Sequence, residues 1–330
     1  MRQQLYRKRG QKNIKLWLAI VAVIVAAALA VGLVLWGLSK PLGPPENSSS
    51  SPSSAATVST RKTLPKSFID RNTAAASIVL ADITSGQMLY RKNADAKRYP
   101  ASMTKLLTAL VAVENAAPDT PITVGQEVHM IGAGSSRAYL TVGSRMTVEQ
   151  LLYAMLLPSG NDAAYVLAVQ VGRLIANDQN VEQRAAVRLF TDTMNKKAAA
   201  LGCTASHFAN PDGYHDDNHY TTADDMAKIA AAALQNDTIA TVTSSTAYHG
   251  TLLSGQSVSW ENSNRLMHEG DIYYYEGAVG LKTGFTDPAG YCLAAAATRE
   301  GRTVVAIVMH ADSNAGRFED ARGLLEIGFQ

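Results

Sequence analysis

A serine and a lysine three positions apart, Ser102 and Lys105, are the residues of this sequence best suited to nucleophilic chemistry. They follow Pro100 at the start of a predicted helix, where residues at this spacing share one face, about 5–6 Å apart at Cβ. A neutral lysine amine there can take the serine proton, and the free N–H groups of the helix start favour the alkoxide. The pair predicts a nucleophile and its base. The simpler alternative is that Ser102 caps the helix and Lys105 is solvated.

A second segment, Ser159-Gly160-Asn161, follows an apolar predicted helix and therefore lies in a loop. A serine hydroxyl there can relay a proton towards a leaving group. The Asn161 amide can hold either a substrate amide or Lys105. Taken alone, the sequence Pro-Ser-Gly-Asn is also an ordinary turn.

A third segment, Lys282-Thr283-Gly284, lies on a predicted strand. We expect Lys282 to supply positive charge without titrating and Thr283 to supply a hydroxyl. Gly284 removes a side chain at a place where the backbone of a ligand comes close. The alternative is an ordinary strand that ends in a turn.

The elements that must position these three segments come from both ends of the sequence. Apolar runs between turn residues predict strands in the first and last parts, and apolar residues at helical spacing predict helices between them. The strands then form one sheet, and the helices form a lobe inserted into that sheet domain. The predicted strands cover residues 76–81, 87–91, 278–282, 291–298 and 303–310, and the predicted helices start after Pro100 and cover 146–157, 163–175, 182–201, 222–234 and 316–327.

The N-terminal residues predict a membrane anchor. Residues 16–38 contain no charged residue and would form a helix about 34 Å long, enough to cross a bilayer core. Residues 1–15 include six basic and no acidic residues, so we expect a basic tail that stays in the cytoplasm. The alternative is a cleaved signal peptide, but its apolar core is normally about 7–15 residues. In both cases the rest of the chain is exported.

Residues 39–65 are rich in proline, serine, threonine and alanine, and such a segment buries too little apolar surface to fold. We expect a flexible stalk, followed by one folded domain over residues 66–330. The basic tail accounts for the net charge of +2, so the exported part is acidic and nucleic-acid binding is not indicated. Cys203 and Cys292 are too few for a disulfide framework; one bridge and two separate buried thiols both stay open.

The three segments occur together and in order, 57 and 123 residues apart. On these residues the sequence resembles the serine penicillin-binding and β-lactamase superfamily, whose marks are Ser-x-x-Lys, Ser-x-Asn and Lys-Thr-Gly. More closely, it resembles the low-molecular-weight D-alanyl-D-alanine carboxypeptidases, which residues 92–102, 219–223 and 280–286 match almost residue for residue. The likeness runs from about residue 70 to the end of the sequence.

The resemblance implies an α/β (α+β) fold of the β-lactamase/transpeptidase-like type. Its sheet would be mainly antiparallel, flanked by helices, with an inserted helical lobe, and here it would be preceded by one transmembrane helix. Residues 66–330 would be the DD-carboxypeptidase catalytic domain, outside the cytoplasmic membrane. Members of the family often continue into a small β-rich domain and a C-terminal amphipathic membrane helix, whereas this sequence stops at Gln330. We therefore expect the N-terminal anchor to replace the usual tail.

The resemblance also implies a mechanism. Ser102 would attack the carbonyl between the two terminal D-alanines of a peptidoglycan stem pentapeptide, with Lys105 as its base. The backbone N–H groups of Ser102 and Phe285 would form the oxyanion hole. Ser159 and Lys282 would pass the proton to the departing D-alanine, and water would hydrolyse the acyl-enzyme. β-Lactam antibiotics would acylate the same serine.

The implied substrate-binding residues meet the backbone and the terminal carboxylate of the stem peptide. A carboxylate needs cationic and hydroxyl partners, which Lys282, Thr283 and Thr286 would supply. Arg317 matches the position of the family's carboxylate-binding arginine. The simpler interpretation of Arg317 is a solvated residue in the first turn of a helix. No metal or cofactor is expected, since the histidines and aspartates between His207 and Asp225 fit no established ligand spacing. The full set is Asn161, Lys282, Thr283, Gly284, Phe285, Thr286 and Arg317.

Three alternatives use the same residues. A β-lactamase of the commonest class needs a glutamate on a dedicated loop, and no Glu-x-x-x-Asn segment lies between Asn161 and Lys282. A DD-endopeptidase that cuts cross-links would use the same site. A membrane receptor acylated by β-lactams would need a cytoplasmic output module, and only about 15 residues precede the predicted anchor.

Overall fold

The computed structural model describes residues 73–330. The predicted basic tail, anchor and stalk, and the first residues of the predicted catalytic domain, lie outside this range. No helix within residues 73–330 is both long and apolar enough to cross a membrane.

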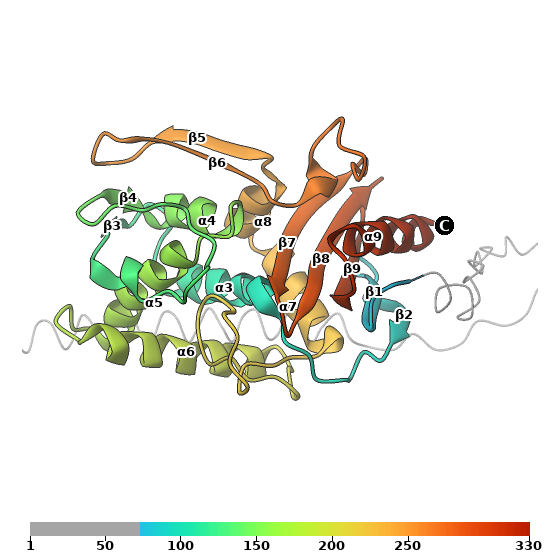
Figure 1. Ribbon diagram of the computed structural model, residues 1–330, viewed down its shortest axis with the longest axis horizontal. Helices are drawn as coiled ribbons and strands as arrows, with labels where there is room; N and C mark the ends of the chain where they lie inside the picture. Colours follow the sequence, from blue (N-terminus) through green and yellow to red (C-terminus); the bar gives the residue numbers. More distant parts are fainter. Residues whose placement is uncertain (1–72) are drawn as a thin grey trace, which may run out of the picture. The chain divides into compact units, whose positions relative to one another are not determined.

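The centre of the structure is a five-stranded sheet in the order β2-β1-β9-β8-β7. Each neighbouring pair is antiparallel. The first two strands come from the start of the described chain and the other three from its end, which confirms the predicted sheet of distant segments (Figure 1). The strands are β1 (Ser77–Asp82), β2 (Gln87–Lys92), β7 (Ala278–Thr286), β8 (Gly290–Arg299) and β9 (Arg302–Ala311).

The central strands are buried on both faces, so they read in the sequence as continuous apolar runs. On one face, Leu293 and Val308 pack with Phe318 of α9 (Asn314–Phe329). On the other, Ala294 and Ile307 belong to the core that continues into the helices. Removing one such large side chain from water stabilises the fold by about 1.5–3 kcal/mol.

The helices between β2 and β7 in the sequence lie mostly beyond β7 in space, whereas α7 (Ala223–Gln235) packs on the face of the sheet against β9 and β1 (Figure 1). The helix α8 (Asp237–Ser244) and the small hairpins β3–β4 and β5–β6 were not predicted. The lobe and its connections comprise η1 (Ala101–Thr104), α3 (Lys105–Asn115), β3 (Pro121–Thr123), η2 (Gln126–His129), β4 (Arg145–Thr147), α4 (Val148–Leu156), α5 (Asn161–Ala176), α6 (Gln183–Ala200), α7 (Ala223–Gln235), α8 (Asp237–Ser244), β5 (Ala247–Thr251), β6 (Ser257–Glu261) and η3 (Arg265–Met267).

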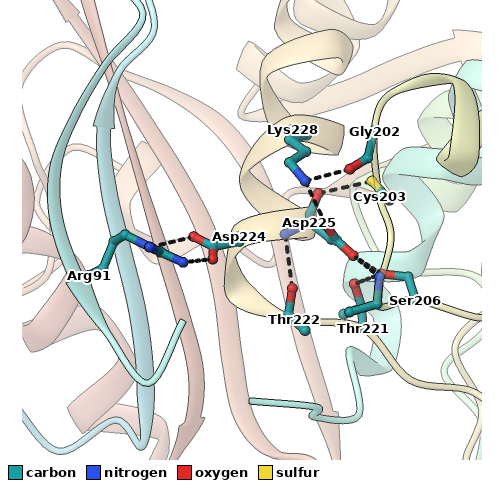
Figure 2. A network of polar contacts seen from close by, with 10 residues as sticks. Arg91, Gly202, Cys203, Ser206, Thr221, Thr222, Asp224, Asp225 and Lys228 are labelled. Atoms are coloured by element: carbon teal, nitrogen blue, oxygen red, sulfur yellow. Dashed lines mark hydrogen bonds and ion pairs between the residues drawn. The ribbon is translucent and has the colours of Figure 1, made fainter. Parts of the chain in front are cut away.

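The start of α7 joins the sheet to the segment that precedes it. Thr222 caps the helix, accepting the N–H of Asp225 at 3.1 Å. Asp224 pairs with Arg91 of β2, and Asp225 accepts hydrogen bonds of 2.8 Å from both Ser206 and Lys228 (Figure 2). Burial opposes ionisation of Asp225, but these hydrogen bonds hold its pKa below the usual value. Both carboxylates therefore have structural partners.

Candidate active site

We call Ser102–Lys105, Ser159–Asn161 and Lys282–Gly284 the first, second and third motifs. The first and second motifs meet at the amine of Lys105, which is fully buried. Its Nζ lies 2.8 Å from Oγ of Ser102 and 2.7 Å from Oδ1 of Asn161. Oγ of Ser159 is 3.5 Å away. The structure thus brings together the predicted nucleophile, its base and two residues of the second motif. Of the two partners expected for Asn161, the structure places Lys105 there.

The partners of Lys105 define where its lone pair points. Besides Asn161 Oδ1, the backbone oxygen of Asp212 lies 2.8 Å from Nζ. Both are carbonyl oxygens, which only accept hydrogen bonds. A neutral amine has two hydrogens, so these two acceptors occupy both and leave the lone pair for the Ser102 hydroxyl. Burial lowers the pKa of Lys105 to about 8, against the raising effect of nearby Asp212 and Asp162.

The turn that carries Ser102 is a short 3-10 helix leading into α3. Ser102 makes no side-chain capping hydrogen bond within the described chain, so the simple capping interpretation fails. Ala101, just before it, has φ of 48°, a left-handed conformation that non-glycine residues adopt at a cost of about 1–3 kcal/mol. Such strain persists only where surrounding contacts impose it.

Those contacts come from His219. Its Nδ1 accepts the N–H of Ala209 at 3.1 Å, so Nε2 carries the ring hydrogen. Nε2 lies 2.7 Å from Oγ1 of Thr104, which in turn donates to the carbonyl of Ala101 at 2.8 Å. Burial lowers the pKa of His219 to about 3, so the ring stays neutral. A histidine that sequence reasoning assigned only as structural thus supports the nucleophile turn.

Gly284 brings the third motif against this turn. A Cβ at Gly284 would lie 2.9 Å from the carbonyl oxygen of Pro100 and 3.2 Å from the backbone nitrogen of Ser102. The glycine therefore makes room for the protein's own nucleophile turn, which places β7 beside Ser102. That it also makes room for the backbone of a ligand stays a prediction.

Ser159 also adopts a left-handed conformation, with φ of 65°. Its carbonyl accepts the hydroxyl of Ser136 at 2.6 Å, and Nδ2 of Asn161 donates to Oγ of Ser135 at 2.9 Å. The second motif is thus held by a serine pair in the loop between η2 and β4. Sequence reasoning did not find this pair, because Ser-Ser in a glycine-rich loop carries no distinctive signal.

Lys282 is buried on β7, and its Nζ lies 3.4 Å from Oγ1 of Thr283. Burial, with further effects of the Lys105 and Arg317 charges, lowers its pKa well below the usual value. Burial thus opposes the permanent positive charge expected of Lys282. The Thr283 hydroxyl shares a hydrogen bond of 2.8 Å with Ser263.

Arg317 is buried at the start of α9, which excludes the interpretation as a solvated residue. Its Nη1 donates to the carbonyl of Gly284 at 2.9 Å and to that of Cys292 at 3.3 Å. Burial lowers its pKa to about 10. Nε has no hydrogen-bond partner among residues 73–330. The guanidinium therefore contacts the third motif through the backbone carbonyl of Gly284.

A cleft of about 430 Å³ opens over Ser102 and Asn161. Its walls are residues 133–136, residues 213–215 and the end of β7 with the turn that follows. Phe285 stacks on Tyr291 with ring centroids 4.4 Å apart. Thr286 lines the cleft, and its Oγ1 accepts the N–H of Ala289 at 3.2 Å, which leaves the hydroxyl hydrogen to donate. A larger cavity of about 550 Å³ near α8 is lined by none of the predicted site residues.

The two cysteines do not pair. Cys203 and Cys292 are both free and buried. Burial raises the pKa of the Cys292 thiol to about 11 and that of Cys203 to about 12. Of the two interpretations left open by the sequence, separate buried thiols hold, and neither group supplies a thiolate to the cleft at neutral pH.

Comparison with solved structures supports the fold. The crystal structure of the Streptomyces K15 DD-transpeptidase matches with a TM-score of 0.71 and 36% identity, over 78% of this chain and 97% of that chain. The D-alanyl-D-alanine carboxypeptidase DacD from Francisella tularensis matches with a TM-score of 0.65 and 29% identity, over 77% of this chain and 70% of that chain. The predicted transpeptidase-like fold of antiparallel sheet and helices is therefore confirmed for the described residues.

Curated relatives carry the same family name. The D-alanyl-D-alanine carboxypeptidase of Streptomyces sp. strain K15 is 37% identical over 254 residues, which are 74% of this chain and 84% of that protein. DacF of Bacillus subtilis, also named a D-alanyl-D-alanine carboxypeptidase, is 33% identical over 77% of this chain, which spans only 62% of its length. The model of the Peptidase S11 family, described as D-alanyl-D-alanine carboxypeptidase, matches residues 62–313. The chain belongs to this family of serine peptidases.

Proposed function

We propose that the protein is a serine DD-carboxypeptidase that removes the terminal D-alanine from peptidoglycan stem pentapeptides through an acyl-enzyme on Ser102. The observation that carries this proposal is the amine of Lys105, 2.8 Å from Oγ of Ser102, with carbonyl oxygens at its other two positions. The names of the relatives from Streptomyces and Bacillus subtilis support the same activity.

In the proposed acylation step, neutral Lys105 takes the proton of Ser102 as Oγ attacks the carbonyl of the penultimate D-alanine. The developing oxyanion would accept hydrogen bonds from the backbone N–H groups of Ser102 and Phe285. Gly284 supports this assignment, because it lets β7 approach the nitrogen of Ser102. Removing one such donor typically slows the reaction by about 10²–10³.

Departure of D-alanine requires a proton on its amine. Lys105 holds the proton taken from Ser102, and Ser159 Oγ lies 3.5 Å from its Nζ. We assign Ser159 as the relay and Lys282 as a second proton carrier, because burial lowers the pKa of Lys282. The same groups would then activate water to hydrolyse the acyl-enzyme.

The terminal carboxylate needs a cation and a hydroxyl. We assign Lys282 and Thr283 to it, since their side-chain polar atoms lie 3.4 Å apart on β7. A bound carboxylate favours the charged form of Lys282 and so returns its pKa towards the usual value. Arg317 donates a hydrogen bond to the carbonyl of Gly284 on β7 and so adds positive charge close to this strand. We assign the Thr286 hydroxyl to the stem backbone.

Penicillin tests the nucleophile directly. Mass spectrometry of the intact domain after penicillin treatment should show one adduct, and peptide mapping should place it on Ser102. No adduct, or an adduct on another residue, would overturn the assignment. Release of D-alanine from a pentapeptide by the same preparation tests the carboxypeptidase activity itself.

Transfer to an amine is the second candidate activity. The Streptomyces K15 protein is named a carboxypeptidase among the curated relatives and a DD-transpeptidase among the solved structures. Both reactions share the acyl-enzyme and differ only in whether water or an amine accepts the acyl group. A DD-endopeptidase would also use this site. Product analysis with an added amino acid acceptor, and with a cross-linked dimer, separates the three.

We also propose that residues 16–38 anchor the protein in the cytoplasmic membrane, with the basic tail inside and the catalytic domain outside. The uncharged run and the six preceding basic residues support this topology. Protease added to intact protoplasts should digest the domain and spare an epitope fused to residue 1. Protection of the domain would contradict the proposal.

A further inference from the structure

A second cavity, which we call the side pocket, adjoins the catalytic cleft. Its volume is about 390 Å³. Pro288 lines both cavities. His215 lines the cleft and packs edge-on against Tyr99 of the side pocket, with ring centroids 4.7 Å apart. A ligand in the cleft can therefore extend past Pro288 into the side pocket. Its lining includes Lys97, Arg98, Tyr99, Asp217, Tyr220 and Pro288.

The side pocket carries charges of both signs. Lys97 Nζ lies 4.0 Å from the ring centroid of Tyr220. Arg98 donates from Nε to Ser77 at 3.1 Å, and its terminal guanidinium nitrogens have no hydrogen-bond partner within residues 73–330. The Asp217 carboxylate is 89% exposed, and Nε2 of His215 lies 3.5 Å from it. None of these groups has a part in the proposed reaction.

In the proposed function the substrate pairs with the edge of β7 as an added strand. This pairing fixes which half of the substrate comes near the side pocket. β7 is the last strand in the sheet order, so one of its edges faces the cleft. If the Phe285 N–H binds the oxyanion, its carbonyl points to the same edge and accepts the N–H of the same substrate residue, as in an antiparallel pair. The departing D-alanine then lies towards Thr283. The preceding stem residue lies towards Thr286 and Pro288.

We propose that the side pocket binds the side chain of the stem residue that precedes the two D-alanines, and that this side chain ends in both an ammonium and a carboxylate group, as in a 2,6-diamino diacid. This inference rests on the proposed function. One residue of extended backbone covers about 3.5 Å, and a long side chain on that residue extends further, towards Pro288 at the border of the two cavities. Lys97 and Arg98 would bind the carboxylate, and Asp217 would bind the ammonium.

The positive charges of Lys97 and Arg98 disfavour a lysine side chain at this position of the stem peptide. A lone ammonium group would gain Asp217 but would meet Lys97 and Arg98 as like charges, which costs binding energy. A lone carboxylate would gain the cations and meet Asp217. Only a group with both charges matches Lys97, Arg98 and Asp217 together. His310, which also lines the side pocket, donates from Nδ1 to the carbonyl of Ala289 at 3.0 Å.

Three pentapeptides that differ only at the third residue test this inference. They carry 2,6-diaminopimelate, lysine and 2-aminopimelate, the last having the carboxylate without the amine. For the wild-type protein we expect kcat/KM for D-alanine release to be highest with diaminopimelate. Exposed charge pairs of this kind change binding by up to about fivefold each. Lys97→Met should lower kcat/KM for the two carboxylate-bearing peptides, and Asp217→Asn for the two ammonium-bearing peptides.

Two surface residues of α6 provide matched controls. Lys196 and Asp192 are exposed and line neither cavity, so Lys196→Met and Asp192→Asn should leave all three rates unchanged. Equal wild-type rates on the three peptides, or equal losses on all three in Lys97→Met and Asp217→Asn, would overturn the side-pocket inference and leave the proposed function standing. No D-alanine release from any peptide would overturn the proposed function as well.

Discussion

The backbone carbonyl of Asp212 accepts a hydrogen bond of 2.8 Å from Nζ of Lys105, 107 positions away in the sequence. The next carbonyl back, that of Pro211, accepts the hydroxyl of Thr108 at 2.6 Å. Gly213 lies so close to the carbonyl of Ala101 that a Cβ there would be 1.9 Å from it. The segment 209–221 thus holds the catalytic helix by main-chain contacts, and it sets the protonation geometry of the base.

The rate of acylation should rise with pH through the pKa of Lys105. Only the neutral amine has a lone pair, and burial lowers the pKa of Lys105 to about 8. We expect the second-order rate constant for penicillin to rise about tenfold per pH unit below that value and to level off about one unit above it. Stopped-flow measurement with a fluorescent penicillin checks this. Lys105→Arg, which stays protonated throughout, should give no acylation; a flat profile for the wild type would refute the lysine base.

Asn161→Asp should move that pH profile to higher values. The Asn161 amide oxygen lies 2.7 Å from Nζ of Lys105, and a carboxylate in its place would favour the ammonium form. An opposite charge at this distance typically raises a pKa by about 1–3 units. Acylation at pH 7 should therefore fall by at least about tenfold and recover at alkaline pH. A loss that does not recover at high pH would mean that Asn161 acts on the substrate and not on Lys105.

The parts of the site that could be predicted are those made by side chains with distinctive chemistry. Ser102, Lys105 and Asn161 were predicted to meet, and they do. The contributions of Asp212 and Gly213 could not be predicted, because they use a carbonyl oxygen and an absent side chain. The spacing of the histidines and aspartates around His219 argued against a metal, but nothing in the sequence indicated that His219 supports the turn that carries Ser102.

In the fold, too, the elements that could be predicted are those with a distinctive residue pattern. β8 and β9 were predicted because burial on both faces makes them continuous apolar runs. The hairpin of β5 and β6 was missed because almost all of its residues are partly or fully exposed, so they have no need to alternate in hydropathy. Lys282 was predicted on a strand, but its protonation depends on burial and on two neighbouring cations that come from other segments.

Thr104→Val should slow acylation more than it destabilises the fold. The change keeps the side-chain volume and removes both the hydrogen bond from His219 and the one to the carbonyl of Ala101. Loss of these bonds costs about 1–3 kcal/mol of stability and releases the left-handed Ala101 that positions Ser102. We expect kcat/KM to fall at least about tenfold with KM little changed. Thr191→Val, which removes one hydroxyl bond inside α6, is the control and should leave kcat/KM unchanged.

Gly284→Ala should slow acylation strongly while the fold persists. The new methyl would lie 2.9 Å from the carbonyl of Pro100 and 3.2 Å from the nitrogen of Ser102, so β7 must move away from the oxyanion site. A loss of about 10²–10³ in the acylation rate is expected, as for a missing oxyanion donor. Gly323→Ala on the exposed face of α9, with no atom within 4 Å of the added methyl, should instead raise the free energy of unfolding by about 0.5–1 kcal/mol at unchanged activity. Normal acylation in Gly284→Ala would show that Phe285 does not contribute to the oxyanion hole.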